Sequence, residues 1–354
     1  MTGVQDKTII WKRCGLLAAS VLLGYGLQHA RIPIPYMLGG ILAMIMAKTF
    51  GDRYLYWPHS WQKLALCVAG YGIGRNFTLD TWNRLLDQTA GVFAATFISL
   101  ALSLVIAVWT HRHTFANLLS CVMGILPGGL MQMMVMSEED ARADANVVMV
   151  SQTLRLLGVV LFVPFLVVHL LGASVLPPAA TQAAQAGGLG WWWLAPVCGV
   201  SVLVAVRLHV PTANLIGPIL GAAIFSCAAG PLQTVPDLLM NLAQINIGLY
   251  MGAMLDKERL WKTRELLPYI LGGTAAMIGV SVAVAKFLAG HYHFSLVAAF
   301  LGMAPGGIAE MCLAGMSMGE DVSMILTYQI VRVIILNVTV PYALHWYFDK
   351  DYQG

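Results

Sequence analysis

Apolar residues fill most of the chain in long stretches that short polar segments separate. In the first half these stretches lie near residues 14–28, 35–48, 61–75, 89–110, 115–136 and 145–171, and the second half divides in the same way. A hydrocarbon core of about 30 Å requires about 20 apolar residues per helix. The pattern therefore predicts an all-α, polytopic membrane protein, and it leaves no room for a sizeable soluble domain.

The fifth stretch contains an interruption, "GILPGGLMQM" (residues 124–133), in which Pro127, Gly128 and Gly129 follow one another. Proline removes a backbone donor and clashes with the preceding turn, while paired glycines let the chain turn and leave N–H groups uncovered. Each unsatisfied backbone group in lipid is costly. The motif therefore predicts a broken helix that lines a cavity; the alternative is a kink against which neighbouring helices pack.

The interruption recurs as "APGGIAEM" (residues 304–311), in which Pro305, Gly306 and Gly307 are displaced by 178 residues from the first copy. The same shift places Gly39 on Gly217, Gly70 on Gly248 and Gly74 on Gly252, and a shift of 177 places Asp144 on Asp321, Gln152 on Gln329 and Arg155 on Arg332. This constant register predicts two tandem homologous membrane repeats. We place them at residues 11–171 and 191–347, with an uncharged linker rich in Ala, Gly and Pro at residues 172–190.

The broken segment leaves two topologies open. If it crosses the membrane, each repeat has six spans and the copies are parallel; if it re-enters, each repeat has five spans and the copies are inverted. Of the 18 basic residues outside the spans, the parallel arrangement puts nine on each side, whereas the inverted one puts 14 in the cytoplasm. Because Lys and Arg gather in cytoplasmic loops, we favour the inverted arrangement. It has about ten transmembrane helices, two re-entrant segments and a cytoplasmic N-terminus in a bacterial inner membrane.

Two arginines lie inside apolar stretches. Arg155 and Arg332 follow Asp144 and Asp321 by eleven residues, which is roughly 16 Å along a helix and near the middle of the bilayer. Each arginine is expected either to bind a carboxylate or phosphate of a substrate, or to pair internally with Glu310 or with carbonyls of the broken segments. The two aspartates are expected to cap their helices, with a substrate role as the alternative.

Some polar positions repeat and one does not. Gln152 and Gln329 precede their arginines by three residues, so each shares a helix face with its arginine. Glu310, in contrast, occupies the position of Gln132. A lone carboxylate beside a helix break is expected to carry a proton or to act as a fixed counter-charge for the second arginine. A substrate site is therefore expected to be asymmetric.

Composition and motifs exclude several functions. The net charge is +3 and the basic residues are scattered, so direct binding of nucleic acid is not expected. The six cysteines have no paired spacing and are read as small buried hydrophobes. Two His-x-His pairs, at residues 111–113 and 291–293, have no neighbouring carboxylate or cysteine. We expect no metal site, no cofactor and no enzyme activity.

The two Pro-Gly-Gly motifs, each followed by Gln132-Met133 or Glu310-Met311, an acidic loop and Gln-x-x-Arg, resemble a duplicated bacterial membrane family called AbrB. The resemblance covers nearly the whole chain. Members are labelled as ammonia monooxygenases or as regulators, but the metal ligands of a membrane monooxygenase and a DNA-binding module are missing here. The soluble DNA-binding protein of the same name shares only the name.

The duplication, the paired breaks and the buried arginines predict a secondary transporter or exporter of a small anionic metabolite. Its expected partners are the lipid bilayer and that small-molecule ligand, and a homo-oligomer is compatible with the sequence. A membrane-embedded sensor or regulator that acts through a partner is the alternative, and a metal-dependent ammonia monooxygenase is the least favoured one. The predicted substrate-binding residues are Pro127, Gly128, Gly129, Gln132, Gln152, Arg155, Asn246, Pro305, Gly306, Gly307, Glu310, Gln329 and Arg332.

Overall fold

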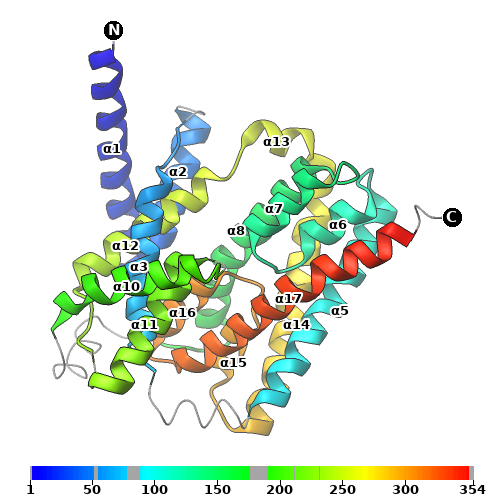
Figure 1. Ribbon diagram of the computed structural model, residues 1–354. Helices are drawn as coiled ribbons and strands as arrows, with labels where there is room; N and C mark the ends of the chain where they lie inside the picture. Colours follow the sequence, from blue (N-terminus) through cyan, green and yellow to red (C-terminus); the bar gives the residue numbers. More distant parts are fainter. Residues whose placement is uncertain are drawn as a thin grey trace. The chain divides into compact units, whose positions relative to one another are not determined.

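The computed structural model describes residues 2–51, 55–77, 88–175, 190–210, 212–230 and 232–350, and these residues form helices joined by turns, with no β-sheet among them (Figure 1). The chain divides into two compact units. Unit 1 comprises Met1–Asp80, Pro164–Lys257 and Leu313–Ser323, and unit 2 comprises Thr81–Val163, Glu258–Cys312 and Met324–Gly354. Each unit takes segments from both predicted repeats. Most of the predicted linker, residues 176–189, lies outside the described residues, so the repeat boundaries stay a prediction.

Unit 1 is built from helices of both sequence halves. Its elements are α1 (Thr2–His29), α2 (Pro35–Phe50), α3 (His59–Gly74), η1 (Trp191–Trp193), α10 (Leu194–Arg207), α11 (Ala213–Ala229) and α12 (Asp237–Ala253). Helix α2 packs between α1 and α12, and α3 packs on α11 and α12. The helices of the first half therefore pack on those of the second half within this unit.

Glycines allow these helices to approach closely. A Cβ atom would overlap the backbone of α11 at Gly70 and Gly74, and it would overlap the backbone of α2 at Gly248 and Gly252. The carbonyl oxygens that it would meet belong to Leu215 and Ile219 on α11 and to Met37 and Ile41 on α2. The residue numbers of these carbonyl groups differ by 178 between the two pairs, as those of the glycines do. The two Gly-x-x-x-Gly pairs thus serve close helix packing.

Unit 2 contains the interrupted helices. Its elements are α5 (Thr89–His113), α6 (Leu118–Ile125), α7 (Leu130–Glu139), η2 (Arg264–Leu266), α14 (Leu267–Tyr292) and α15 (Leu296–Met303), together with most of α8 (Ala145–His169), α13 (Lys257–Lys262) and α17 (Val322–Lys350) and the first part of α16 (Ile308–Met318). Helices α5 and α14 lie side by side, with α6 against α5 and α15 against α14 (Figure 1). A core of buried apolar residues from α5, α6, α8, α14 and α17 fills this unit.

By length and composition, four segments in the described part of the chain are able to cross a bilayer: Thr89–His113, Ala145–His169, Arg264–Tyr292 and Val322–Leu344. Other apolar helices, among them α2, α10 and α11, have 14 to 17 residues, or roughly 21–26 Å. The all-α fold is confirmed. About ten spans and an inverted arrangement of the repeats stay predictions.

Candidate functional site

Both predicted helix breaks are present. Helix α6 ends at Ile125 and α7 begins at Leu130, while α15 ends at Met303 and α16 begins at Ile308. Helices α6 and α15 have eight residues each, about 12 Å, which is less than half of a hydrocarbon core. We call residues 126–129 the first break and residues 304–307 the second break. The carbonyls that precede each break have no partner within the helix and need other donors.

Helix caps and glycine contacts repeat around the breaks. Asp144 Oδ1 accepts hydrogen bonds from the N–H groups of Asn146 and Val147, and Asp321 Oδ1 accepts one from Ser323 N–H, so the predicted capping role of both aspartates is confirmed. A Cβ atom at Gly124 would lie 2.8 Å from Ser151 Cβ, and one at Gly302 would lie 3.1 Å from Tyr328 Cβ. Close packing thus holds α6 on α8 and α15 on α17.

Two glutamines occupy matching positions beside the breaks. Each donates its Nε2 hydrogens to one carbonyl near the end of the short helix and to the first carbonyl of the break in its own half of the sequence. The acceptors are Met123 (2.6 Å) and Leu126 (2.9 Å) for Gln152, and Leu301 (2.8 Å) and Ala304 (3.1 Å) for Gln329. Both side chains are fully buried. The residue numbers of the acceptors also differ by 178 between the two halves. The two halves therefore hold their breaks in the same way.

Arg332 binds the second break. Its Nη1 donates to the carbonyls of Met303 (3.1 Å) and Ala304 (2.8 Å), and its Nη2 donates to the carbonyl of Gly306 (3.2 Å) and to Gln329 Oε1. The guanidinium is therefore held by the last carbonyl of α15, by two carbonyls of the second break and by the glutamine that shares its helix face.

Arg155 does not mirror this arrangement. Its Nη2 donates to Gln152 Oε1 (2.7 Å) in its own helix, but its Nη1 donates to the carbonyl of Pro305 (2.6 Å), which belongs to the second break. Pro305 is adjacent in sequence to Gly306, the acceptor of Arg332. The two guanidiniums therefore converge on neighbouring carbonyls of the second break.

Both guanidiniums are buried cations that have no anionic partner among the described residues. The exposed fractions are 5% for Arg155 and 3% for Arg332. Within the described part of the chain, neither makes an ion pair with a carboxylate, and the Nε atom of each has no hydrogen-bond partner. A buried charge is costly unless an opposite charge compensates it. The second break thus concentrates positive charge that its own carbonyls only partly offset.

Glu310 lies at the start of α16 and does not neutralise Arg332. Its side chain is 8% exposed, and it accepts a hydrogen bond from its own backbone N–H. A Cβ atom at Gly307 would overlap the Glu310 carboxylate, so this carboxylate lies against the N-terminus of α16, where backbone N–H groups favour an anion. Of the two internal partners that the sequence left open for Arg332, the structure shows carbonyls of the second break and no ion pair with Glu310.

The first break is held by an amide. Gly129 N–H donates to Asn337 Oδ1 (3.4 Å), and Gln132 Nε2 donates to the Asn337 carbonyl (3.2 Å). Pro127 and Gly128 are buried in the same break. The sequence analysis did not identify Asn337. The available signal was an asparagine inside an apolar stretch, five residues after Arg332, at the position that Val160 occupies in the first half.

Comparison with known proteins identifies the family. The family model described as "Transition state regulatory protein AbrB" matches residues 36–348. The chain belongs to the AbrB family. Two relatives are similar over nearly their whole length: "Uncharacterized protein YhjN" of Bacillus subtilis (strain 168), at 24% identity over 95% of this chain and 93% of that protein, and "Putative regulator AbrB" of Escherichia coli (strain K12), at 26% identity over 92% and 93%. The resemblance read from the motifs is confirmed.

The remaining predicted residue of this AbrB-family chain, Asn246, belongs to unit 1. Its Oδ1 accepts a hydrogen bond from Trp57 Nε1 (3.1 Å), and its Nδ2 donates to the Leu242 carbonyl (2.7 Å). These contacts hold a buried tryptophan. The other predicted residues belong to unit 2, and a substrate-binding role of Asn246 stays a prediction.

The histidines of this AbrB-family chain have local contacts. His113 stacks on Tyr269, His291 stacks on Phe287, and His111 Nδ1 lies 2.9 Å from the Ala116 carbonyl oxygen. In the described part of the chain, no three or more His, Cys, Asp or Glu side chains gather in a group suited to a metal ion. The expectation that the protein is not an enzyme stays a prediction.

The acidic loop between α7 and α8 contains one ion pair. Arg142 Nη2 lies 2.8 Å from Asp140 Oδ2, and the side-chain hydrogen bond from Arg142 lowers the pKa of the Asp140 carboxyl below its ordinary value. The second half has Met316-Ser317-Met318 where the first half has Glu138-Glu139-Asp140, at the end of α7 and the start of this loop. Exposed pairs of this kind contribute little stability, so the loop is set apart from the buried charges at the breaks.

Proposed function

We propose that this protein is a secondary transporter of a small anionic metabolite in a bacterial inner membrane, and that Arg155 and Arg332 bind the anion at the second break. One observation carries the proposal. Two buried guanidiniums reach adjacent carbonyls, Pro305 and Gly306, and neither has a carboxylate partner within the described residues. A carboxylate or phosphate group would supply the missing negative charge and would accept hydrogen bonds from the guanidinium edges.

The unpaired Nε atoms favour a ligand over a purely structural role. Arg332 already uses all four Nη hydrogens to hold backbone or glutamine oxygens, and only its Nε donor is left over. Arg155 uses one hydrogen of each Nη, so its Nε and one hydrogen on each Nη are left over. An anion that approaches the Nε edge could bind without first breaking the contacts that hold the break together. Buried charged residues in membrane segments commonly mark ion or substrate pathways.

Glu310 gives the site a competing anion. Its carboxylate occupies the N-terminus of α16, where free N–H groups would also favour a substrate anion. We propose that an incoming anion and ionised Glu310 disfavour each other, so that protonation or displacement of Glu310 accompanies binding. Gln132 at the equivalent position of the first break carries no charge, which would restrict this competition to one break.

The matched contacts of the two halves support a duplicated transporter architecture. Gln152 and Gln329 hold equivalent carbonyls, and Gly70 and Gly248 pack on equivalent residues of α11 and α2. Paired broken helices in duplicated, inverted halves are typical of secondary transporters, which work by rocking one bundle against the other. We propose the inverted arrangement, with the N-terminus in the cytoplasm, for this chain as well.

Flux through proteoliposomes tests the proposal. Purified protein would be reconstituted and assayed for uptake of radiolabelled succinate, pyruvate and inorganic phosphate, with Arg155→Lys and Arg332→Lys as variants that keep the charge but lose the guanidinium. We expect uptake of at least one anion by the wild type and a loss of at least about tenfold in both variants. Arg207→Gln, at an exposed arginine, is the control and should transport normally.

The outcome is informative even if a variant is unstable. Variants would be compared only where gel filtration shows the same monodisperse peak as the wild type. Full transport by both folded lysine variants would remove the arginines from the mechanism, and no saturable flux of any of these anions by the wild type would contradict the transporter proposal.

A membrane-embedded regulator is the second candidate. The family description contains the words "regulatory protein" and the name of the E. coli relative contains "regulator". Lys257, Lys262 and Arg264, at α13 and η2, form an exposed basic segment that could contact an acidic partner. For a regulator, Lys257→Gln with Lys262→Gln would abolish signalling in cells and leave ligand binding intact. For a transporter, the same double variant would leave flux unchanged.

A further inference from the structure

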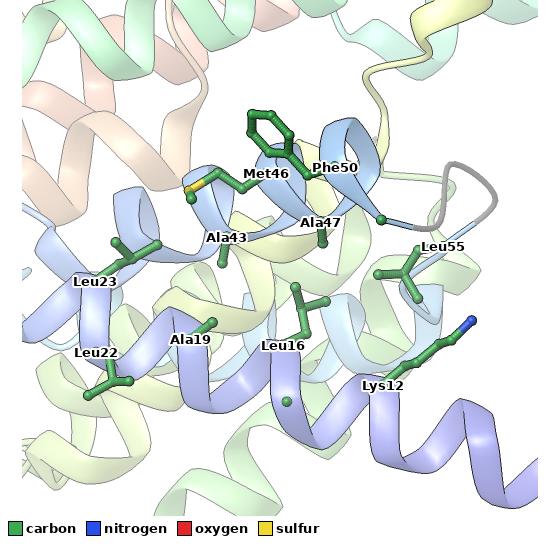
Figure 2. A pocket seen from close by; sticks show the side chains of 12 residues that line it. Lys12, Leu16, Ala19, Leu22, Leu23, Ala43, Met46, Ala47, Phe50 and Leu55 are labelled. Carbon is green, nitrogen blue, oxygen red and sulfur yellow. The ribbon is translucent and has the colours of Figure 1, made fainter.

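The other large feature of the molecule is an apolar groove between α1 and α2 in unit 1. The groove has a volume of about 710 Å³, within the range of ligand-binding pockets, which is roughly 300–1,000 Å³. Figure 2 shows Leu16 and Ala19 on α1 facing Ala43 and Ala47 on α2, with Lys12 near one end and Leu23 near the other. Hydrocarbon therefore lines the length of the groove, and a single basic side chain marks its end.

The groove follows from how α1 and α2 diverge. The two helices touch most closely where a Cβ atom at Gly39 would lie 2.6 Å from Gly24 N and 2.7 Å from the Ser20 carbonyl oxygen. Two turns earlier, a Cβ atom at Gly15 would meet nothing within 4 Å. The helices thus separate from Gly24 toward Lys12 and leave the groove open along its length.

The dimensions and the surroundings match one leaflet of a bilayer. From Lys12 to Leu23 the groove follows α1 for about 16 Å, close to half of a hydrocarbon core of about 30 Å. Exposed aromatic residues lie at the basic end, where Trp11 is 77% and Tyr56 is 61% exposed. Aromatic residues of this kind are typical of the headgroup level. The Arg13 guanidinium lies over the Tyr56 ring at 5.1 Å, so a second cation belongs to the same level.

We propose that this groove binds one anionic phospholipid, with an acyl chain along Leu16, Ala19, Ala43 and Ala47 and with the headgroup phosphate beside Lys12. Basic sites beside transmembrane helices attract anionic lipid headgroups. An acyl chain fits a groove without polar groups better than a solute or an acidic peptide would. The lipid is a distinct ligand from the transported anion, because every lining residue belongs to unit 1 and the arginines belong to unit 2.

Native mass spectrometry of the full chain in detergent tests this site, with dioleoyl phosphatidylglycerol as the anionic probe and dioleoyl phosphatidylcholine as the zwitterionic probe. The wild type should bind the first phosphatidylglycerol more tightly than phosphatidylcholine. Lys12→Gln should lower the affinity for phosphatidylglycerol by roughly fivefold, the contribution of one basic residue near an anionic surface, and should leave that for phosphatidylcholine unchanged.

Gly15→Leu and Gly26→Leu form a matched pair that tests the groove itself. Both glycines lie exposed on α1, and a Cβ atom at either meets nothing within 4 Å, but only Gly15 lines the groove. Gly15→Leu should weaken binding of both lipids at least about fivefold by filling the groove, and Gly26→Leu should have no effect. Both changes raise helix propensity equally.

Three results would overturn the proposal: equal affinity of the wild type for the two lipids, an unchanged phosphatidylglycerol affinity in Gly15→Leu, or conversion of a wild-type dimer to a monomer by Gly15→Leu with lipid binding intact. The last result would make the groove an interface between two copies of this chain. If Gly15→Leu does not fold, Lys12→Gln, at an exposed side chain, still decides the matter. None of these results depends on which solute is transported.

Discussion

The two breaks of unit 2 have the same frame and different chemistry. In both, a buried glutamine binds two carbonyls and a glycine packs against the helix that carries the glutamine. Around the second break, two arginines bind four carbonyls, one of which Gln329 also binds, and a carboxylate lies at the following helix. At the first break, Asn337 is the polar side chain that holds the glycine N–H.

This difference indicates which features are architectural and which are specialised. The glutamine contacts are needed wherever a helix is interrupted, because buried carbonyls must be satisfied in either copy. The arginines meet the same need at Pro305 and Gly306, and they exceed it at Ala304, whose carbonyl Gln329 already binds. Charge is thus concentrated at one of two equivalent frames, and the substitutions below test that asymmetry.

The largest expected effect distinguishes the two arginines. Arg332→Gln removes a donor from three carbonyls: Gly306 loses its donor, Met303 keeps Ser281 Oγ (3.4 Å), and Ala304 keeps Gln329 and the Gly306 N–H, whereas Arg155→Gln deprives only Pro305. A buried hydrogen bond contributes about 0.5–1.5 kcal/mol, and an unpaired buried carbonyl costs about 1–3 kcal/mol. Arg332→Gln should therefore lower the free energy of unfolding by roughly 1–3 kcal/mol more than Arg155→Gln does, because the loss of one buried charge and of one carbonyl's donor is common to both. Denaturation in mixed micelles would measure it, and equal losses would contradict the asymmetry.

For the two glutamines, the substitution beside the first break should be the more destabilising one. Gln152→Leu removes the side-chain donor to both Met123 and Leu126, whereas after Gln329→Leu the Ala304 carbonyl keeps Arg332. We expect a loss of about 2–4 kcal/mol for Gln152→Leu and about half of that for Gln329→Leu, measured by the same denaturation assay. A larger loss for Gln329→Leu would show that the arginine does not support the second break.

The glycine contacts should respond similarly in both copies. Gly124→Ala places a methyl group 2.8 Å from Ser151 Cβ, and Gly302→Ala places one 3.1 Å from Tyr328 Cβ. Overpacking costs about 1–3 kcal/mol, partly offset by about 0.5–1 kcal/mol of helix propensity. Each variant should lose roughly 1 kcal/mol, with Gly124→Ala slightly worse. Adding Ser151→Gly should restore the stability of the Gly124→Ala variant and should not restore that of the Gly302→Ala variant. If the stability of Gly124→Ala is not restored, the contact with Ser151 is not the cause of its loss.

The smallest effect concerns affinity. Glu310→Gln should leave stability nearly unchanged, because the amide oxygen can still accept a hydrogen bond at the start of α16. It should lower the half-saturating concentration of a transported anion by roughly two- to fivefold, the equivalent of about 0.3–1 kcal/mol for one charge at a helix N-terminus. Gln132→Glu, which puts a carboxylate at the first break, is the matched control. If Glu310→Gln and Gln132→Glu changed the half-saturating concentration by equal factors, the carboxylate at the second break would have no special role.

Much of this arrangement could be predicted because it depends on local chemistry. Pro-Gly-Gly interrupts a helix wherever it occurs, an aspartate before an apolar stretch caps it, and the repeat register identified Gln152 and Gln329 as equivalent. The asymmetry of charge was anticipated from Glu310 alone. The length of individual helices was less predictable, since apolar stretches do not show where a helix of 14 to 17 residues ends.

The destination of Arg155 could not be predicted. Spacing placed it beside Gln152, and it does bind that side chain, but its second contact lies 150 residues away at Pro305. Such a contact depends on how segments of the two halves pack in unit 2. The alignment of one half of the sequence on the other carries no information about that packing. Asn337 was missed for the same reason, because its partners Gly129 and Gln132 lie in the other half of the sequence.

The exchange of helices between the halves has a consequence for how such a protein can arise and be made. In unit 1, α2 from the first half packs on α12 from the second, and α3 packs on α11, while both units draw on segments from each side of residues 172–190. A gene cut between those residues would encode two fragments, neither of which holds the partner surfaces that its helices require. Only co-expression would let them complement each other. If the predicted repeats arose by duplication, a single-copy ancestor would have had to assemble as an intertwined pair of identical chains before its gene was duplicated and fused.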